Sequence, residues 1–162
     1  MAFLAAAVAG APGCAGSDGE ARAAGAAQIG TPVVTIPSQL LGLRVELADI
    51  SELVGDLENA HVDSVALFTM REGDLLRATL QVSRFEPGSP AGPGFRRQVV
   101  EQLGTRTPIE LNVAGTNVFS TGGTQQSVYV WFDNGKMIIL SIQQDFEFPR
   151  LLLRRALEGM RI

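Results

Sequence analysis

The chain has 162 residues, of which 46% are hydrophobic and 19% are charged, a composition typical of one globular domain with a substantial core. It contains no run of about 18 apolar residues, so the sequence predicts no membrane-spanning helix. The formal net charge is −4, but residues 61–162 hold ten acidic and eleven basic residues and are nearly neutral. Because no basic stripe is present to neutralise phosphates, nucleic acid is not an expected partner.

The first 30 residues differ in composition from the rest of the chain. A short apolar run from Met1 to Gly10 is followed by Ala11-Pro12-Gly13-Cys14, and then by a low-complexity stretch rich in Ala and Gly that reaches Gly30. Such a stretch has few side chains that could pack into a core. We therefore expect residues 1–30 to be a leader and disordered linker, and residues 31–162 to be a single domain.

This order of apolar run, small residues, cysteine and polar linker resembles the leader of bacterial lipoprotein precursors. In that family a peptidase cuts before the cysteine, whose thiol carries a diacylglycerol. The resemblance implies a lipid anchor on Cys14 and an extracytoplasmic domain at the cell membrane. The leader departs from the family in having no basic residue before Arg22, and in having Ala11 where Leu is usual. Ordinary secretion, and a linker with an incidental cysteine, stay open as alternatives.

The predicted elements of the first half are short strands and one helix. Asp49-Ile50-Ser51-Glu52 has the spacing of a capping box, so a helix is expected over 50–59. Gly42 weakens the strand that is expected from Leu40 to Leu47. Apolar and polar residues alternate from Leu75 to Phe85, which indicates a strand with one buried and one polar face. The expected strands are Val33 to Ile36, Leu40 to Leu47, and a hairpin of Val62 to Met70 with Leu75 to Phe85.

The second half has clearer signals. A helix is expected over 93–103, with Pro93 in its first turn and Gly104 at its end. Asn134-Gly135 is a strong hairpin signal because both residue types tolerate positive φ. A last helix is expected from Pro149 to Glu158. The strands expected between the helices are Pro108 to Val113, Asn117 to Thr121, Gln126 to Phe132 and Lys136 to Ile142.

Together these elements predict an α+β fold. Sequential strands joined by short turns form an antiparallel meander, and we expect a two-layer sandwich in which two or three amphipathic helices cover one face. The element order of the second half, with the segment Asn112 to Val118, resembles PsbP/Mog1-like domains and the extracytoplasmic sensor domains of anti-sigma factors. Neither resemblance includes a diagnostic motif, so no functional residue carries over from either family.

The residue types that serve catalysis and metal binding are scarce. Cys14 and His61 are the only cysteine and histidine, so His/Cys metal sites and cofactor binding are not expected. His61-Val62-Asp63-Ser64 holds the residue types of a catalytic triad, but neighbouring side chains in a strand point to opposite faces. A carboxylate-based hydrolase stays open as a less favoured alternative. Its candidate acids are Asp63, Glu110, Asp145 and Glu147.

Two aromatic residues are the candidate binding surface. Tyr129 and Trp131 share one face of a predicted strand, opposite Val128 and Val130. If the helices cover the valine face, the aromatic side chains are available to a ligand or partner. The alternative is that a third layer or the N-terminal strands bury them.

The last helix carries four arginines, which form either a solvated face or a surface for an anionic membrane. They are Arg150, Arg154, Arg155 and Arg161.

Taken together, the leader and the scarcity of catalytic residue types predict a non-catalytic, membrane-tethered binding or accessory domain of the cell envelope, whose partner is an envelope protein or a small ligand. An extracytoplasmic sensor domain of a membrane signalling system is the alternative.

Overall fold

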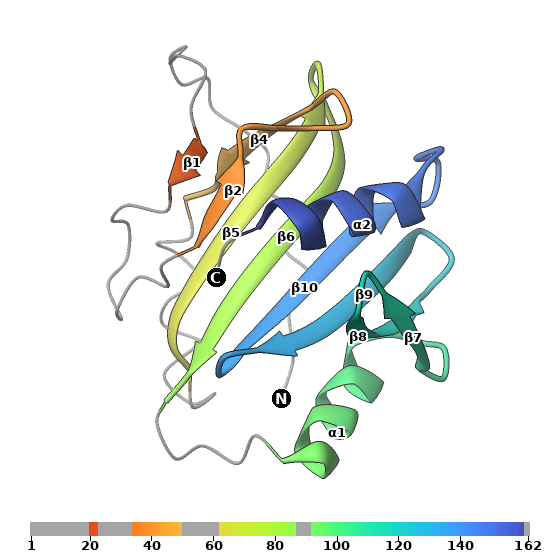
Figure 1. The fold of residues 1–162 in the computed structure, drawn as a ribbon. Coiled ribbons are helices and arrows are strands. Elements are labelled where there is room, and N and C mark those ends of the chain that lie inside the picture. Colours follow the sequence, from red (N-terminus) through yellow and green to blue (C-terminus); the bar gives the residue numbers. More distant parts are fainter. Residues whose placement is uncertain (1–19, 23–33, 50–61, 87–91, 161–162) are drawn as a thin grey trace.

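The computed structural model describes residues 20–22, 34–49, 62–86 and 92–160. These residues form a twisted eight-stranded antiparallel sheet, a separate two-stranded sheet and two helices (Figure 1). The prediction of an α+β fold with an antiparallel sheet is therefore confirmed. The helix predicted over 50–59 lies outside the described residues. No helix of the described part is both long and apolar enough to cross a membrane.

The first half of the sheet is a meander in which each strand pairs with the next. The predicted hairpin is confirmed, and its first strand extends two residues further than expected. Gly42 divides the predicted strand 40–47, because Leu41 and Gly42 have φ of 52° and 79° and form a two-residue turn. The four strands are β3 (Gln39–Leu40), β4 (Leu43–Leu47), β5 (Val62–Glu72) and β6 (Leu75–Phe85).

The second half is another meander, and the four predicted strands are confirmed. They are β7 (Ile109–Val113), β8 (Thr116–Gly122), β9 (Gln126–Asp133) and β10 (Lys136–Gln143). Strand β10 pairs with β6, and this contact joins the two meanders into one sheet of order β3-β4-β5-β6-β10-β9-β8-β7. Two of the three turns of this meander are Ala114-Gly115 and Asn134-Gly135, and all four of these residues have positive φ.

The N-terminal strands form the small second sheet. Strand β1 (Glu20–Arg22) pairs with β2 (Thr35–Pro37), so three residues that we expected to be linker are extended and hydrogen-bonded. In β2, Ile36 is fully buried and joins the main core. Strand β2 contacts the last helix, which closes this side of the domain.

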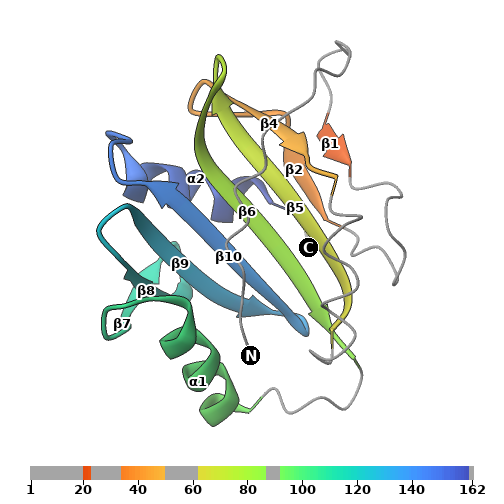
Figure 2. The same ribbon diagram turned by 180° about the vertical axis from the view of Figure 1, so that it is seen from behind.

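The two helices, α1 (Pro93–Leu103) and α2 (Pro149–Gly159), start as predicted and end within one residue of their predicted ends. Helix α2 buries Leu152 and Leu153 in a cluster with Ile138, whereas α1 buries Val100 in a cluster with Met137. Neighbouring residues of one strand point to opposite faces, so the helices lie on opposite faces of the sheet (Figures 1 and 2).

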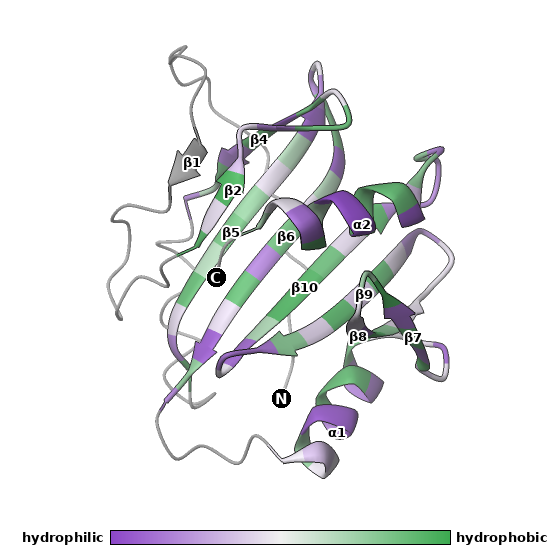
Figure 3. Cartoon of the chain, viewed as in Figure 1, coloured by the Kyte–Doolittle hydropathy of each residue, from purple (hydrophilic) through white to green (hydrophobic). Residues whose placement is uncertain are grey.

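This placement differs from the expected two-layer arrangement, in which helices cover one face. The physical reason is visible in Figure 3, where strand β10 is hydrophobic along most of its length. In β10 the positions from Met137 to Leu140 are all buried, and in β9 those from Val128 to Trp131 are buried. A strand that is apolar at successive positions needs cover on both faces. The described helices supply that cover from both sides.

Helix α1 ends where the backbone comes close to β8. A Cβ added to Gly104 would meet the side chain of Thr121 and would lie 2.7 Å from the backbone nitrogen of Gly122. Thr121 Oγ1 donates a hydrogen bond to the carbonyl of Arg106 at 2.8 Å, just after the helix. Position 104 therefore needs glycine because a side chain would clash with β8, and not because its φ is unusual. The hydrogen bond between Thr121 and Arg106 holds the C-terminal end of α1 on the sheet.

Candidate functional site: an exposed apolar end of the sheet

Three connections lie at the same end of the sheet. The pairs Arg44↔Arg71 and Ala78↔Ile142 place the start of β4, the end of β5, the start of β6 and the end of β10 at that end. The β3–β4 turn, the β5–β6 turn and the β10–α2 connection therefore line up along one edge of the molecule, at the upper right in Figure 1. We call this region the loop end and define it by four residues on these connections and in the first turn of α2. They are Leu41, Leu75, Phe148 and Leu151.

All four of these side chains are exposed to solvent. The exposed fractions are 39% for Leu41, 59% for Leu75, 51% for Phe148 and 41% for Leu151. Among the described residues only one other large hydrophobic residue, Ile109, is exposed. Single exposed apolar residues are ordinary, whereas a group of them at one end of a domain is a candidate interaction site. With strands about 4.8 Å apart, the connections at β4 and β10 are separated by about 14 Å.

The backbone at Leu41 is unfavourable for its side chain. Its φ of 52° is in the left-handed region, which costs an L-residue other than Gly, Asn or Asp about 1–2 kcal/mol. The first position of this turn type favours Asn, Asp or Gly, and the same backbone at Asn134-Gly135 indeed has Asn. Neither the turn geometry nor core packing accounts for an exposed leucine here.

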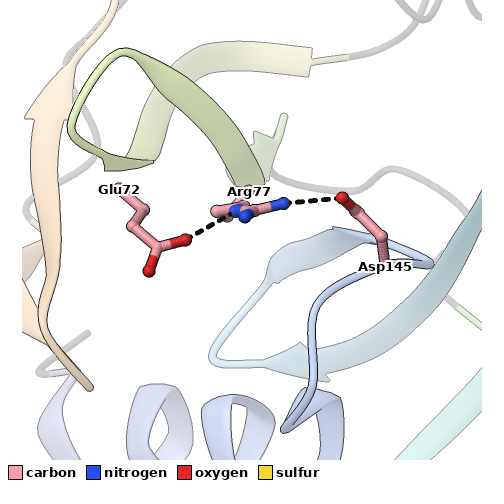
Figure 4. A network of polar contacts seen from close by, with 3 residues as sticks. All are labelled: Glu72, Arg77 and Asp145. Carbon is pink, nitrogen blue, oxygen red and sulfur yellow. Dashed lines mark hydrogen bonds and ion pairs between the residues drawn. The ribbon is translucent and has the colours of Figure 1, made fainter.

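One arginine ties two of the connections together (Figure 4). The guanidinium of Arg77, on β6, donates from Nε to Glu72 Oε2 at 2.9 Å and from Nη1 to Asp145 Oδ2 at 2.6 Å. Its side chain is mostly covered, whereas both carboxylates are exposed. The hydrogen bond with Glu72 is the main cause that raises the pKa of Arg77, so the guanidinium is charged at any ordinary pH. The network fixes the β5–β6 turn relative to the β10–α2 connection.

Charged side chains of both signs surround the apolar residues of the loop end. Arg44 forms an ion pair with Glu46 at 3.1 Å, and Arg71 Nη1 donates to the carbonyl of Asp74 at 3.0 Å. Arg150 and Glu147 are exposed beside Phe148. The mixture of signs does not form the positive field that attracts phosphate groups. It resembles instead the polar rim that surrounds the apolar centre of a protein–protein interface.

Tyr129 and Trp131, the predicted binding surface, are buried in the structure. Their exposed fractions are 5% and 2%, and both belong to the core cluster beneath α2. The alternative in which another layer buries them is therefore the one that the structure shows, and that layer is α2. Burial raises the pKa of the Tyr129 hydroxyl, and the nearby charge of Arg150 partly opposes this shift.

The arginines of the last helix are exposed, as predicted. Arg154 and Arg155 both pair with Glu158, at 2.7 Å and 3.3 Å. The hydrogen bond from Arg154 is the main cause that lowers the pKa of Glu158. Part of the positive charge is thus neutralised on the helix itself, while Arg150 remains at the loop end and Arg161 lies outside the described residues.

The four candidate acids do not gather as one group, although Asp145 and Glu147 share the β10–α2 connection. Asp63 pairs with Arg84 at 3.2 Å near the start of β5, whereas Asp145 pairs with Arg77 at the loop end, so the two acids lie at opposite ends of the sheet. Glu110 lies on the edge strand β7. In the part of the chain that the structure describes, no three His, Cys, Asp or Glu residues are placed to hold a metal ion. Cys14 and His61 lie outside that part.

The loop end was not among the predicted sites. Its signals were present as apolar residues beside turn residues, at Leu41-Gly42 and Asp74-Leu75. These signals are weak, because whether such a residue is exposed depends on which distant segments pack beside it. Comparisons of the chain with protein-family models, curated proteins and solved structures found no match.

Proposed function

We propose that this protein is a non-catalytic binding domain of a bacterial cell envelope, tethered to the membrane by a lipid on Cys14, and that it contacts a partner protein through the loop end. The observation that carries the proposal is the group of four exposed apolar side chains on or next to the connections at one end of the sheet. Leu41 also supports the proposal, because an exposed leucine in the left-handed backbone region is not favoured by folding.

The dimensions and chemistry of the loop end favour a protein over a small ligand. Its apolar side chains come from separate connections across a span of about 14 Å, and charged groups of both signs surround them. Protein interfaces have this pattern of an apolar centre, often aromatic, within a polar rim. Phe148 is the aromatic candidate for the centre of the contact.

With a membrane tether, a small contact surface is sufficient for binding to a partner in the same membrane. Residues 15–19, which separate Cys14 from strand β1, are Ala-Gly-Ser-Asp-Gly, a composition typical of a flexible linker. An anchored domain on such a linker meets a membrane-bound partner at a high effective concentration. A contact that is weak in dilute solution is then occupied at the membrane.

The tether is tested by metabolic labelling. Cells that express the full chain are grown with a clickable fatty acid, and the labelled protein is compared with a Cys14→Ser variant. We expect label in the parent chain and none in the variant, together with release of the variant from the membrane fraction. Label that persists in Cys14→Ser would exclude the anchor.

The loop end is tested by photo-crosslinking in the same cells. A photoreactive amino acid is placed at Leu75, at Phe148 or, as the matched control, at Asn134 in a turn at the opposite end of the sheet. We expect one adduct of the same mass from the first two positions and none from Asn134. Adding Leu41→Asn should weaken that adduct several-fold. Equal adducts from all three positions, or none from any, would contradict the proposal.

The identity of the protein in the adduct separates two roles. A structural or transport component of the envelope would assign an accessory role. A membrane signalling protein would instead assign the alternative of an extracytoplasmic sensor domain. Both roles use the same tether and the same loop end, so the crosslinking result decides between them.

A further inference from the structure

Strand β7 is an open edge of the large sheet. It is the last strand in the sheet order and pairs only with β8. In both views no described element lies beyond it (Figures 1 and 2). It presents five residues, whereas the strand at the opposite edge, β3, has two. Natural proteins usually protect such an edge with Lys, Pro, a bulge or a covering segment. Strand β7 contains neither Lys nor Pro.

The turn at the end of β7 fixes which backbone groups are free. Val113 pairs with Thr116 across the two-residue turn Ala114-Gly115, so this pair exchanges backbone hydrogen bonds. Hydrogen-bonded and non-hydrogen-bonded pairs alternate along an antiparallel ladder. The N–H and C=O groups of Glu110 and Asn112 therefore point away from β8, toward the open edge.

The side chains of β7 divide into an apolar and a polar face. Leu111 and Val113 pack against the main core cluster on the α2 side of the sheet. Ile109 lies on the same face by alternation but is 63% exposed, the largest exposed fraction among the large hydrophobic residues described. Glu110 and Asn112 are exposed on the other face. An added strand would find both free hydrogen-bonding groups and an apolar row to continue.

We propose that this edge binds a second copy of the chain, with the two β7 strands antiparallel and centred on Leu111. In this register Glu110 faces Asn112 of the second copy, and each of the two equivalent pairs forms two backbone hydrogen bonds. Ile109 faces Val113 of the second copy and loses its exposure to water. The apolar row of each sheet then continues into the other sheet.

Neighbouring registers are less favourable. Centring the pair on Glu110 would place two glutamates directly opposite each other, which is destabilising in a sheet. Centring it on Asn112 would leave Ile109 without an opposing strand residue. Pairing through five residues gives an interface well below the 1,200–2,000 Å² that is typical of stable complexes. The dimer is therefore weak in solution and is favoured where copies share one membrane surface.

The register is tested by disulfide trapping in the full chain carrying Cys14→Ser. Because Cys14 is the only cysteine, this background contains no other thiol and no lipid, so the outcome is independent of the proposed tether and of the loop end. Leu111→Cys places two thiols opposite each other in a non-hydrogen-bonded pair, with Cα atoms about 4.5 Å apart. Ile109→Cys is the control, since its thiol faces Val113.

Under mild oxidation we expect Leu111→Cys to form covalent dimers at least several-fold faster than Ile109→Cys. Equal rates, or faster dimerisation of Ile109→Cys, would overturn the register. The fluorescence of Trp131, the only tryptophan, checks that both variants are folded. Ile109 is the more exposed of the two positions, so exposure alone predicts the opposite order.

A charge test measures the same contact without covalent trapping. Asn112→Lys places lysine opposite Glu110 of the second copy, and Asn112→Glu places two acids opposite each other. Both variants lose the Asn112 Nδ2 hydrogen bond to Asn117 Oδ1 at 3.2 Å, so they are matched in that respect. In sedimentation equilibrium we expect Asn112→Lys to dimerise on the order of tenfold more tightly. Two monomeric variants at millimolar concentration, or equal affinities, would overturn the dimer.

Discussion

The two ends of the sheet use turns with the same backbone conformation but different side chains. At the loop end Leu41-Gly42 has φ of 52° and 79°, and at the opposite end Asn134-Gly135 has φ of 46° and 73°. Asparagine suits such a turn because its short polar side chain tolerates the left-handed region. Leucine does not, and Leu41 is also not buried. A third turn with this backbone, Ala114-Gly115, has a small side chain at the left-handed position. Among these three turns only Leu41-Gly42 exposes a large apolar side chain there, as the proposed contact with a partner would require.

The largest expected effect separates exposed aromatic residues from buried ones. Trp131→Ala removes a fully buried side chain, and we expect it to lower the free energy of unfolding by about 3–5 kcal/mol. Phe148→Ala should change it by less than about 0.5 kcal/mol, because Phe148 is half exposed at the loop end. Urea unfolding followed by circular dichroism measures both values. A cost above about 2 kcal/mol for Phe148→Ala would make the loop end a structural feature.

A smaller effect is expected where α1 reaches the sheet near the loop end. Gly104→Ala would place a Cβ against Thr121 and the backbone of Gly122, and overpacking of this kind costs about 1–3 kcal/mol. Gly94→Ala is the matched control in the same helix, since its added Cβ meets nothing within 4 Å. That control should be neutral or slightly stabilising. Equal effects of the two substitutions would show that the close approach at Gly104 relaxes without cost.

The next prediction exchanges the residues of the two turns. Leu41→Asn should raise the free energy of unfolding by about 0.5–1 kcal/mol, because asparagine fits the left-handed position. Asn134→Leu should lower it by about the same amount. Thermal unfolding of the two single variants and of the double exchange measures these shifts. If Leu41→Asn destabilises the domain, then the leucine makes intramolecular contacts that matter, and the two ends do not differ in the way proposed.

Local signals were sufficient to predict most elements of this fold. Asn134-Gly135 predicted a hairpin because the two residue types match the backbone of the turn, and Pro149 marked the start of α2. The pairing of β6 with β10 could not be predicted in the same way. These strands are separated in the chain by a helix and three strands, and no local pattern specifies which strand edges will meet.

The faces covered by the helices were also beyond local prediction. In β9 every position from Val128 to Trp131 is buried, so alternation could not show which face a helix would cover. This ambiguity is why Tyr129 and Trp131 stood as candidate surface residues. The loop end was missed for a related reason, since exposure of Leu75 or Phe148 depends on the absence of packing from distant segments. Cys14 remains a prediction from its sequence context alone.

The smallest effect concerns Tyr129, which lies beneath the helix whose first turn carries Leu151. Burial raises the pKa of its hydroxyl, so the folded domain favours the neutral form and the tyrosinate forms at higher pH than in the unfolded chain. The free energy of unfolding should therefore be unaffected by Tyr129 below the unfolded pKa of about 10, and should fall as the pH rises through the folded pKa. Tyr129→Phe should remove that part of the pH dependence.

Tyr129 is the only tyrosine, so an ultraviolet absorbance titration of the folded chain reports its ionisation directly. Arg150 opposes the shift, and Arg150→Gln should raise the pKa of Tyr129 further. This variant also tests whether the start of α2 is held against the sheet. If Tyr129 titrates as an ordinary exposed tyrosine, α2 does not bury it stably, and the position of Phe148 and Leu151 at the loop end would not be fixed by the fold.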